Sequence, residues 1–135
     1  MLYAAYGSNL LAAQMQARCP GAARAGTVLL PGFRLAMNRF ASARPDPAAI
    51  LPVGLWQVTA EHLADLDRYE GPHTYTRRSI ALPGGGEAWI YIEITPRPPP
   101  PAAEYVERCR TGTLEFGLST AALDAALAAI GWRPT

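Results

Sequence analysis

The amino-acid sequence predicts an α+β fold, because segments with the period of a strand and segments with the period of a helix share one chain of 135 residues. Residues Glu87 to Ile94 alternate between an isoleucine face and a face of larger or charged side chains, as a two-sided strand does. Residues Ala60 to Glu70 repeat apolar side chains at the spacing of an amphipathic helix. The first ten residues combine both patterns, since an apolar segment runs through a polar turn into a helical one.

The composition limits the class of protein. We expect a single domain over residues 1–135, which is long enough to bury a core. Lys and Arg total 12 and Asp and Glu total 11, and the lack of a basic stripe argues against a nucleic-acid partner. The apolar runs are shorter than the roughly 18 residues that cross a bilayer, so we expect no membrane partner. Cys19 and Cys109 lie far apart without metal-ligand spacing, which favours a reduced, cytoplasmic setting.

The turn Tyr6-Gly7-Ser8-Asn9 is a candidate anion-binding site. Such a turn directs several backbone N–H groups toward one point beside the positive end of a helix, and so favours carboxylates or oxyanions. Gly7 permits close approach to the backbone, and Ser8 and Asn9 can cap the helix. The alternative is an ordinary turn, because any β-to-α connection prefers Gly, Ser and Asn. Spacing alone favours this alternative.

Proline and glycine mark the limits of the next elements. A short helix covers Leu10 to Arg18 and ends at Pro20-Gly21. Strands cover Thr27 to Leu30 and Phe33 to Met37, and Pro31-Gly32 between them predicts a hairpin or a corner.

The following segment leads to the second informative helix. Residues Arg39 to Pro47 have the composition of an exposed loop, and Val53 to Val58 form a predicted strand. Thr59 is a good N-cap for the helix that follows.

Glu70 is the candidate acid/base. It shares the apolar face of its helix with Leu63 and Leu66 and lies in the last turn, before the stop at Gly71-Pro72. The negative end of the helix dipole and burial both disfavour a charged carboxylate, so we expect a raised pKa, which suits proton transfer. The alternative is that the helix end frays and Glu70 points to water. The pattern gives these two interpretations equal weight.

A β-hairpin is predicted after this helix. Its strands are Tyr75 to Leu82 and Glu87 to Ile94, and Pro83 to Gly86 form its turn. The isoleucine face of the second strand belongs to the core. The face with Trp89 and Tyr91 is either a second packed surface or the lining of a pocket, and core packing is the commoner outcome.

The C-terminal part is expected to form a last helical layer. The Pro-rich segment Pro96 to Pro101 is extended and carries the chain from the sheet to this layer. A short helix from Ala102 to Arg110 contains Tyr105, and Ser119 is predicted to cap a final helix with one apolar stripe.

The residue inventory excludes several classes of catalyst. Two His and two Cys, all widely separated, do not assemble a metal site. The glycines from Gly84 to Gly86 lack the Lys and the Ser or Thr of a phosphate-binding loop, and Ser8 lacks the surroundings of a nucleophile elbow. One glutamate on an apolar face, one backbone turn and several tyrosines remain. This set suits proton transfer and anion binding without a cofactor.

The segment Tyr6-Gly7-Ser8-Asn9-Leu10 resembles the N-terminal motif of the γ-glutamylcyclotransferase family, which includes the AIG2-like proteins. Leu66-Asp67-Arg68-Tyr69-Glu70-Gly71, followed by Tyr75, resembles the segment that holds the catalytic glutamate of this family. Further similar segments, in the same order, are Arg18 to Ala22, Leu30 to Leu35, Val53 to Trp56 and Pro99 to Tyr105. The resemblance covers most of the chain.

The resemblance implies a small mixed β-barrel-like sheet flanked by short helices. It also implies a reaction in which the α-amine of a γ-glutamyl amide attacks its own γ-carbonyl, releasing 5-oxoproline and an amine. Glu70 would shuttle the proton between the two amines. The residues expected to hold the glutamyl carboxylate, the carbonyl oxygen or both are Tyr6, Gly7, Ser8, Asn9 and Leu10.

Three tyrosines complete the site that the resemblance implies. Tyr105 matches a substrate-contacting position, and Tyr75 and Tyr91 are weaker candidates for the pocket wall, Tyr91 being more readily explained as structural. The nucleophile belongs to the substrate, so no cofactor is expected, and the expected partner is a small-molecule γ-glutamyl substrate. The amine half and the oligomeric state stay open.

Two other functions compete with the enzyme. One is a binding protein that retains the pocket without turnover, against which an intact Glu70 weighs. The other is an interaction module that uses Pro96 to Pro101 as a ligand for a Pro-binding partner, which no second recognition feature supports.

Overall fold

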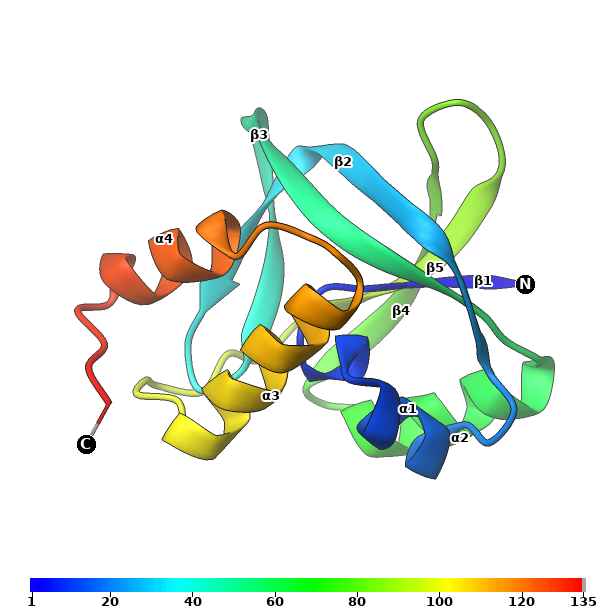
Figure 1. The fold of residues 1–135 in the computed structure, drawn as a ribbon, viewed down its shortest axis with the longest axis horizontal. Helices are drawn as coiled ribbons and strands as arrows, with labels where there is room; N and C mark the ends of the chain where they lie inside the picture. The colour runs from blue at the N-terminus through cyan, green and yellow to red at the C-terminus, as the bar shows by residue number, and fades with distance from the viewer. Residues whose placement is uncertain (135) are drawn as a thin grey trace.

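A five-stranded sheet forms the centre of the computed structural model, which describes residues 1–134 (Figure 1). The strands are β1 (Leu2–Ala5), β2 (Ala23–Met37), β3 (Ala41–Gln57), β4 (Tyr75–Ala81) and β5 (Glu87–Glu93). The helices are α1 (Ala12–Arg18), α2 (Ala60–Glu70), α3 (Ala103–Glu115) and α4 (Ala121–Ala129), and a short 3₁₀ helix, η1 (Ser8–Leu10), precedes α1.

The strand order is β2-β3-β1-β5-β4, and the sheet is mixed because β1 and β5 are parallel whereas the other neighbours are antiparallel. The predicted α+β class is confirmed. The sheet is open, with β2 and β4 at its edges, rather than closed into a barrel. In Figure 1, α1, α2 and α3 lie on the same side of β1, and α4 packs against β2.

The strands β2 and β3 form one long hairpin, so of the two alternatives predicted at Pro31-Gly32, a hairpin or a corner, the hairpin is wrong. These two residues lie inside β2, where the register with β3 shifts between Pro31 and Phe33. An edge strand tolerates a proline, because the missing N–H can face away from the sheet, and Gly32 adopts a φ of 88°, which fits a bulge. The pair therefore bends a continuous strand instead of ending one.

The segment Arg39 to Pro47 is not the exposed loop that its composition predicts. The chain turns at residues 38–40, β3 begins at Ala41, and the side chains of Ala41, Ser42 and Ala43 are buried. A strand rich in Ala and Pro lacks the alternation of large apolar and polar residues on which the prediction depends.

The helix α2 has the predicted limits and caps. Thr59 Oγ1 accepts a hydrogen bond from His62 N at 3.1 Å, and His62 Nδ1 accepts one from Thr59 N at 3.2 Å, so a capping box is present. The helix ends before Gly71, whose φ is 77°. Both leucines of its apolar face are buried, which fixes the rotation of α2 and directs Glu70 to the same side.

The connection between β1 and α1 packs tightly against α3. Neither N-cap residue, Gly7 of η1 or Leu11 of α1, makes a side-chain cap hydrogen bond, so the predicted capping by Ser8 and Asn9 does not occur. The first N–H group of α1, that of Ala12, instead donates to Glu115 Oε1 of α3 at 2.9 Å. Gly112 of α3 approaches this connection so closely that a Cβ there would lie 2.4 Å from Leu11 N. The backbone of the turn is thus held by the neighbouring helix α3 rather than by side chains of the turn itself.

The C-terminal elements follow the prediction with small shifts. The predicted hairpin after α2 is confirmed as β4 and β5, and the Pro-rich segment connects β5 to α3, which is longer than predicted. The N-cap of α4 is Thr120, and the Ser119 hydroxyl accepts a hydrogen bond from Ala121 N at 3.1 Å. None of the helices in the described part of the chain is long and apolar enough to cross a membrane.

Candidate functional site

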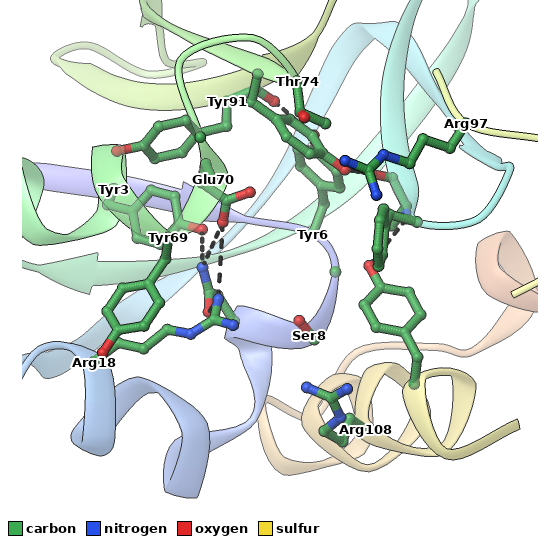
Figure 2. Close-up of a pocket in the computed structure, with 17 residues that line it drawn as sticks. Tyr3, Tyr6, Ser8, Arg18, Tyr69, Glu70, Thr74, Tyr91, Arg97 and Arg108 are labelled. Carbon is green, nitrogen blue, oxygen red and sulfur yellow. Dashed lines mark hydrogen bonds and ion pairs between the residues drawn. The ribbon is translucent and has the colours of Figure 1, made fainter. Parts of the chain in front are cut away.

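A cavity of about 380 Å³ lies where the turn after β1, the end of α2 and the start of α3 meet (Figure 2). It collects residues from seven segments that are far apart in the sequence. Its wall consists of Tyr3, Tyr6, Gly7, Ser8, Asn9, Arg18, Phe40, Ala41, Tyr69, Glu70, Gly71, Thr74, Tyr75, Tyr91, Arg97, Tyr105 and Arg108.

Glu70 lies in this wall at the C-terminal end of α2. Asn9 Nδ2 donates a hydrogen bond to Glu70 Oε1 at 3.2 Å, and Arg18 Nη1 lies 4.0 Å from the same oxygen. Figure 2 shows Glu70 and Arg18 directed toward each other. The Glu70 side chain is only 17% exposed. The alternative in which the helix end frays and Glu70 points to water is therefore wrong.

Burial changes the acidity of this carboxyl group. It raises the pKa of Glu70 from 4.5 to about 7, while Arg18 and the hydrogen bond from Asn9 act in the opposite direction. A carboxyl group with such a pKa is present in both protonation states at neutral pH. It can therefore accept a proton and return it in one reaction cycle.

Asn9 is the centre of the network behind this carboxylate. Its Nδ2 also donates to Tyr3 Oη at 2.9 Å, and its Oδ1 accepts hydrogen bonds from Gln14 Nε2 at 2.9 Å and Arg18 Nη1 at 3.1 Å. The residue is 4% exposed. Because the buried Asn9 amide makes all of these hydrogen bonds, it has little freedom to rotate. It therefore fixes the position of Glu70 Oε1, to which it donates.

The turn from Gly7 to Asn9 supplies unpaired backbone donors. The N–H groups of Gly7, Ser8 and Asn9 make no hydrogen bond to any group within residues 1–134, and all three residues line the cavity. Gly7 leaves room at this point, because a Cβ would lie 3.1 Å from Ala41 Cβ and 3.3 Å from Tyr105 Oη. Unpaired N–H groups in a concave wall can receive a carbonyl or anionic oxygen.

Three of the predicted tyrosines form part of the wall, with hydroxyls that are already hydrogen-bonded. Tyr6 Oη donates to Tyr91 O at 2.5 Å, and Tyr75 Oη donates to Ala41 O at 2.8 Å. Tyr105 Oη accepts a hydrogen bond from Ala41 N at 2.9 Å. Burial raises the pKa of all three hydroxyls, so they are neutral at physiological pH and shape the cavity without adding charge.

Tyr91 belongs both to the wall and to the core. Its ring packs edge-on against Tyr3 at 5.8 Å between centroids. Its hydroxyl donates to Asp67 Oδ1 at 2.6 Å, and Arg77 binds the same carboxylate through Nε at 3.0 Å and Nη2 at 3.2 Å. Burial alone would raise the pKa of Asp67, but these hydrogen bonds outweigh it and hold the pKa below its usual value.

Leu10 is the one predicted site residue that does not line the cavity. Its side chain is 1% exposed and packs in the core beside Gly54, where a Cβ would lie 2.7 Å from it. The motif Tyr6 to Leu10 thus ends in a residue that anchors the turn. The other predicted residues, Glu70, Tyr6, Gly7, Ser8, Asn9, Tyr75, Tyr91 and Tyr105, all lie in the wall.

Sequence reasoning missed the three arginines of the wall. Arg108 follows Tyr105 by three residues and so lies on the same face of α3, a spacing that could have identified it. Arg18 is at the end of a short helix, and Arg97 is in the Pro-rich segment, where no periodicity indicates a direction. Phe40, Thr74 and Tyr3 were also not predicted.

The chemistry of the wall is that of an anion-binding site with one proton-exchanging group. Within residues 1–134, no group of three or more His, Cys, Asp or Glu side chains is arranged to hold a metal ion. The wall offers one carboxylate, three guanidinium groups, neutral hydroxyls and unpaired backbone N–H groups. Such a wall can bind a small molecule with carboxylate or carbonyl oxygens and move one proton on it.

Comparison with known proteins gives a consistent group of matches. A family model described as “Gamma-glutamyl cyclotransferase, AIG2-like” matches residues 3–108. A solved γ-glutamyl cyclotransferase is similar with a TM-score of 0.79 and 24% sequence identity, over 100% of this chain and 89% of that chain. A search of curated proteins finds no significant match.

Two further solved structures share the fold. An uncharacterized protein from Homo sapiens has a TM-score of 0.78 and 25% identity, over 99% of this chain and 88% of that chain. The protein YkqA from Bacillus subtilis has a TM-score of 0.78 and 18% identity, over 100% of this chain and 55% of that chain. The fold is therefore retained where the sequences have diverged widely.

Proposed function

The chain belongs to the γ-glutamyl cyclotransferase, AIG2-like family, and from this premise we propose that it acts on γ-glutamyl amides. The substrate α-amine attacks its own γ-carbonyl, a five-membered ring closes, and 5-oxoproline and the free amine leave. No side-chain nucleophile is needed, because the nucleophile belongs to the substrate. The observation that supports this most is the Glu70 carboxylate in the cavity wall, held by Asn9 of the turn.

Glu70 is proposed to move the proton. The attacking α-amine is an ammonium at neutral pH, with an unperturbed pKa of about 7.7–8.0, and must first lose a proton. With its pKa raised to about 7, Glu70 is close enough in basicity to take this proton and then to give it to the leaving nitrogen. General acid–base catalysis of this kind contributes about 10²–10⁴ in rate.

The turn is proposed to hold the oxygens of the glutamyl half. Its unpaired N–H groups can bind the α-carboxylate, the γ-carbonyl oxygen, or both, and they can stabilise the oxyanion that forms when the ring closes. The tyrosines that line the concave wall favour a folded substrate in which amine and carbonyl meet. Holding these two groups in contact supplies a large part of the rate, because the reaction is intramolecular.

The test is an assay of 5-oxoproline release over a panel of γ-glutamyl amides, in which Glu70→Gln is compared with the wild type. Glu61→Gln is the matched control, since Glu61 is an exposed glutamate at the other end of the same helix. We expect release by the wild type and by Glu61→Gln, and a loss of about 10³ in kcat for Glu70→Gln.

Two outcomes would contradict the proposal. Equal activity of Glu70→Gln and the wild type would show that Glu70 does not move the proton. If no γ-glutamyl amide reacts although several bind, the protein is the non-catalytic binding protein that shares this pocket.

A further inference from the structure

Tyr3 is a tyrosine of the cavity wall that lies on β1, the middle strand of the sheet. Its neighbours across the sheet are Trp56 of β3 and Trp89 of β5, and its ring packs edge-on against Tyr91. The residue is 4% exposed. The core therefore fixes the ring in one position while the residue borders the cavity, as a preorganised group of an active site requires.

The hydroxyl of Tyr3 accepts a hydrogen bond but has no acceptor of its own within residues 1–134. Asn9 Nδ2 donates both to Tyr3 Oη at 2.9 Å and to Glu70 Oε1 at 3.2 Å. The hydroxyls of Tyr6 and Tyr75, by contrast, donate to backbone oxygens. A buried donor without an acceptor is unfavourable, so the hydroxyl hydrogen of Tyr3 favours an oxygen of a bound molecule.

Tyr3 Oη and Glu70 Oε1 are neighbours in the wall. Both lie within hydrogen-bond distance of the same Asn9 nitrogen, and Figure 2 shows Tyr3 directed toward Glu70. Burial raises the pKa of Tyr3, and the charge of Glu70 raises it further, so the hydroxyl keeps its proton at neutral pH. Tyr3 is thus a neutral donor beside the group that exchanges a proton.

Ring closure brings one particular substrate oxygen close to Glu70. The α-amine that gives its proton to Glu70 bonds to the γ-carbonyl carbon, so the γ-carbonyl oxygen then lies two bonds from the amine nitrogen. The oxygens of the α-carboxylate lie three bonds from it. As the new C–N bond forms, an electron pair of the C=O bond moves to the oxygen, which becomes an oxyanion. A donor beside Glu70 is therefore close to the atom on which charge develops.

The order of proton transfer also favours the oxyanion over the α-carboxylate beside Glu70. Before ring closure Glu70 must be ionised to accept the proton, and a second carboxylate next to it would be repelled. When the oxyanion forms, Glu70 already holds the proton and is neutral. The oxyanion therefore meets no like charge at this position, whereas the α-carboxylate is better placed at the backbone N–H groups of the turn.

On the basis of the function proposed above, we infer that Tyr3 is a second catalytic residue, whose hydroxyl donates a hydrogen bond to the γ-carbonyl oxygen as ring closure makes it an oxyanion. Tyr3 keeps its proton throughout. The C=O bond then re-forms, the C–N bond to the leaving amine breaks, and Glu70 gives its proton to the leaving nitrogen. The hydrogen bond is stronger to the oxyanion than to the neutral carbonyl, so it raises kcat rather than tightening the binding of substrate.

Tyr3→Phe tests the inference, because it removes the hydroxyl and keeps the ring with its contact to Tyr91. The substrate is the γ-glutamyl amide of the panel with the highest kcat/KM for the wild type. We expect kcat to fall by about 10² and KM to stay within about twofold of the wild-type value, because the loss of one oxyanion donor costs about 10²–10³ in kcat. Circular dichroism verifies the fold of the variant.

Thr113→Val is the matched control, because it removes another buried hydroxyl without a change of side-chain shape. Thr113 is 7% exposed, its Oγ1 donates to Cys109 O at 2.7 Å, and it does not line the cavity. The kcat of Thr113→Val is expected to equal that of the wild type. A loss as large as that of Tyr3→Phe would show a general effect of removing a buried hydroxyl and would overturn the inference.

Two further measurements separate action on the oxyanion from an effect on other groups. The rising limb of the kcat/KM profile of Tyr3→Phe should lie at the same pH as in the wild type, and a shift would mean that the hydroxyl acts through the acidity of Glu70. Calorimetry should give Glu70→Gln, with and without Tyr3→Phe, affinities for the amide within about twofold of each other. A tenfold loss would place the hydroxyl on the α-carboxylate instead. Either result overturns the inference.

The same assay distinguishes failure of this inference from failure of the proposed reaction. If the wild type releases 5-oxoproline and Tyr3→Phe has the same kcat, the inference fails and the reaction with Glu70 stands. If the wild type turns over no γ-glutamyl amide, the proposed function fails and the inference fails with it.

Discussion

Glu70, whose side chain is 17% exposed, and Glu93, which is buried, are two glutamates whose surroundings differ in one decisive respect. Glu70 ends α2 and Glu93 ends β5, and burial raises the pKa of both carboxyl groups. Glu70 lies in the cavity wall, whereas Glu93 is 5% exposed, does not line the cavity, and accepts a hydrogen bond from Asn38 Nδ2 at 3.5 Å. A raised pKa thus identifies a buried carboxyl, and access to the cavity decides whether it can exchange a proton with a bound molecule.

The largest expected difference is in turnover. Glu70→Gln is expected to lower kcat by about 10³, because its amide cannot carry the proton, whereas Glu93→Gln is expected to leave kcat roughly unchanged. The measurement is 5-oxoproline release at pH 8, with circular dichroism of both variants to verify the fold. An equal loss in a folded Glu93→Gln would abolish the distinction between the two glutamates.

The second difference is in stability against pH. Between pH 4.5 and about 7 the folded protein binds a proton at Glu70 more tightly than the unfolded chain does, so the free energy of unfolding falls as the pH rises through this window. At about 1.4 kcal/mol per pH unit, the ionised carboxylate costs about 3 kcal/mol above pH 7. Glu70→Gln avoids this cost.

We therefore expect the free energy of unfolding of Glu70→Gln, relative to the wild type, to rise by about 3 kcal/mol between pH 4 and pH 8.5. Urea unfolding at the two pH values measures it, with Glu61→Gln as the exposed control. A constant difference between Glu70→Gln and the wild type would mean that the carboxyl group has its ordinary pKa.

A smaller effect is expected from the charge beside Glu70. Arg18 lowers the pKa of this carboxyl, so Arg18→Gln should move the rising limb of the kcat/KM profile to higher pH. Since a partly exposed ion pair is worth about 0.2–1 kcal/mol, activity at pH 7 should fall by about fivefold or less. Arg68→Gln, which removes an exposed arginine from α2, should leave the rising limb of the kcat/KM profile at the same pH as in the wild type. A shift of this limb in Arg68→Gln equal to that in Arg18→Gln would indicate a long-range effect of net charge.

The smallest effect concerns the amide that contacts Glu93. Asn38→Ala removes the donor of a long hydrogen bond and should lower the free energy of unfolding by about 1 kcal/mol or less, with unchanged turnover. Thermal unfolding and the 5-oxoproline assay check both parts. A marked loss of turnover would connect Glu93 to the reaction after all.

The sequence predicts secondary structure best where capping and stop residues agree with the pattern of buried apolar side chains. Thr59, Gly71 and the apolar face between them define α2 from its first residue to its last, and this helix determines where Glu70 points. The prediction failed for β2 and β3, because Pro31-Gly32 has the composition of a turn and only the pairing with β3 makes it a bulge. Such pairing joins residues far apart in the chain and leaves no local signal.

The candidate site is likewise predictable only where a local sequence signal exists. The motif in the sequence identifies the turn from Tyr6 to Asn9. The position on the apolar face of a helix identifies Glu70. Arg97 could not be predicted, since its direction depends on a tie between the Pro-rich segment and the β2–β3 turn. The turn and Glu70 are thus encoded in local motifs, whereas the position of Arg97 depends on tertiary contacts.

The close approach of α3 to the turn has a consequence for genetics. A side chain at Gly112 would act as a wedge against the backbone of Leu10 and Leu11, and would displace the helix that carries Tyr105 and Arg108. A random-mutagenesis screen for inactive protein should therefore recover position 112 alongside position 70, although Gly112 does not line the cavity.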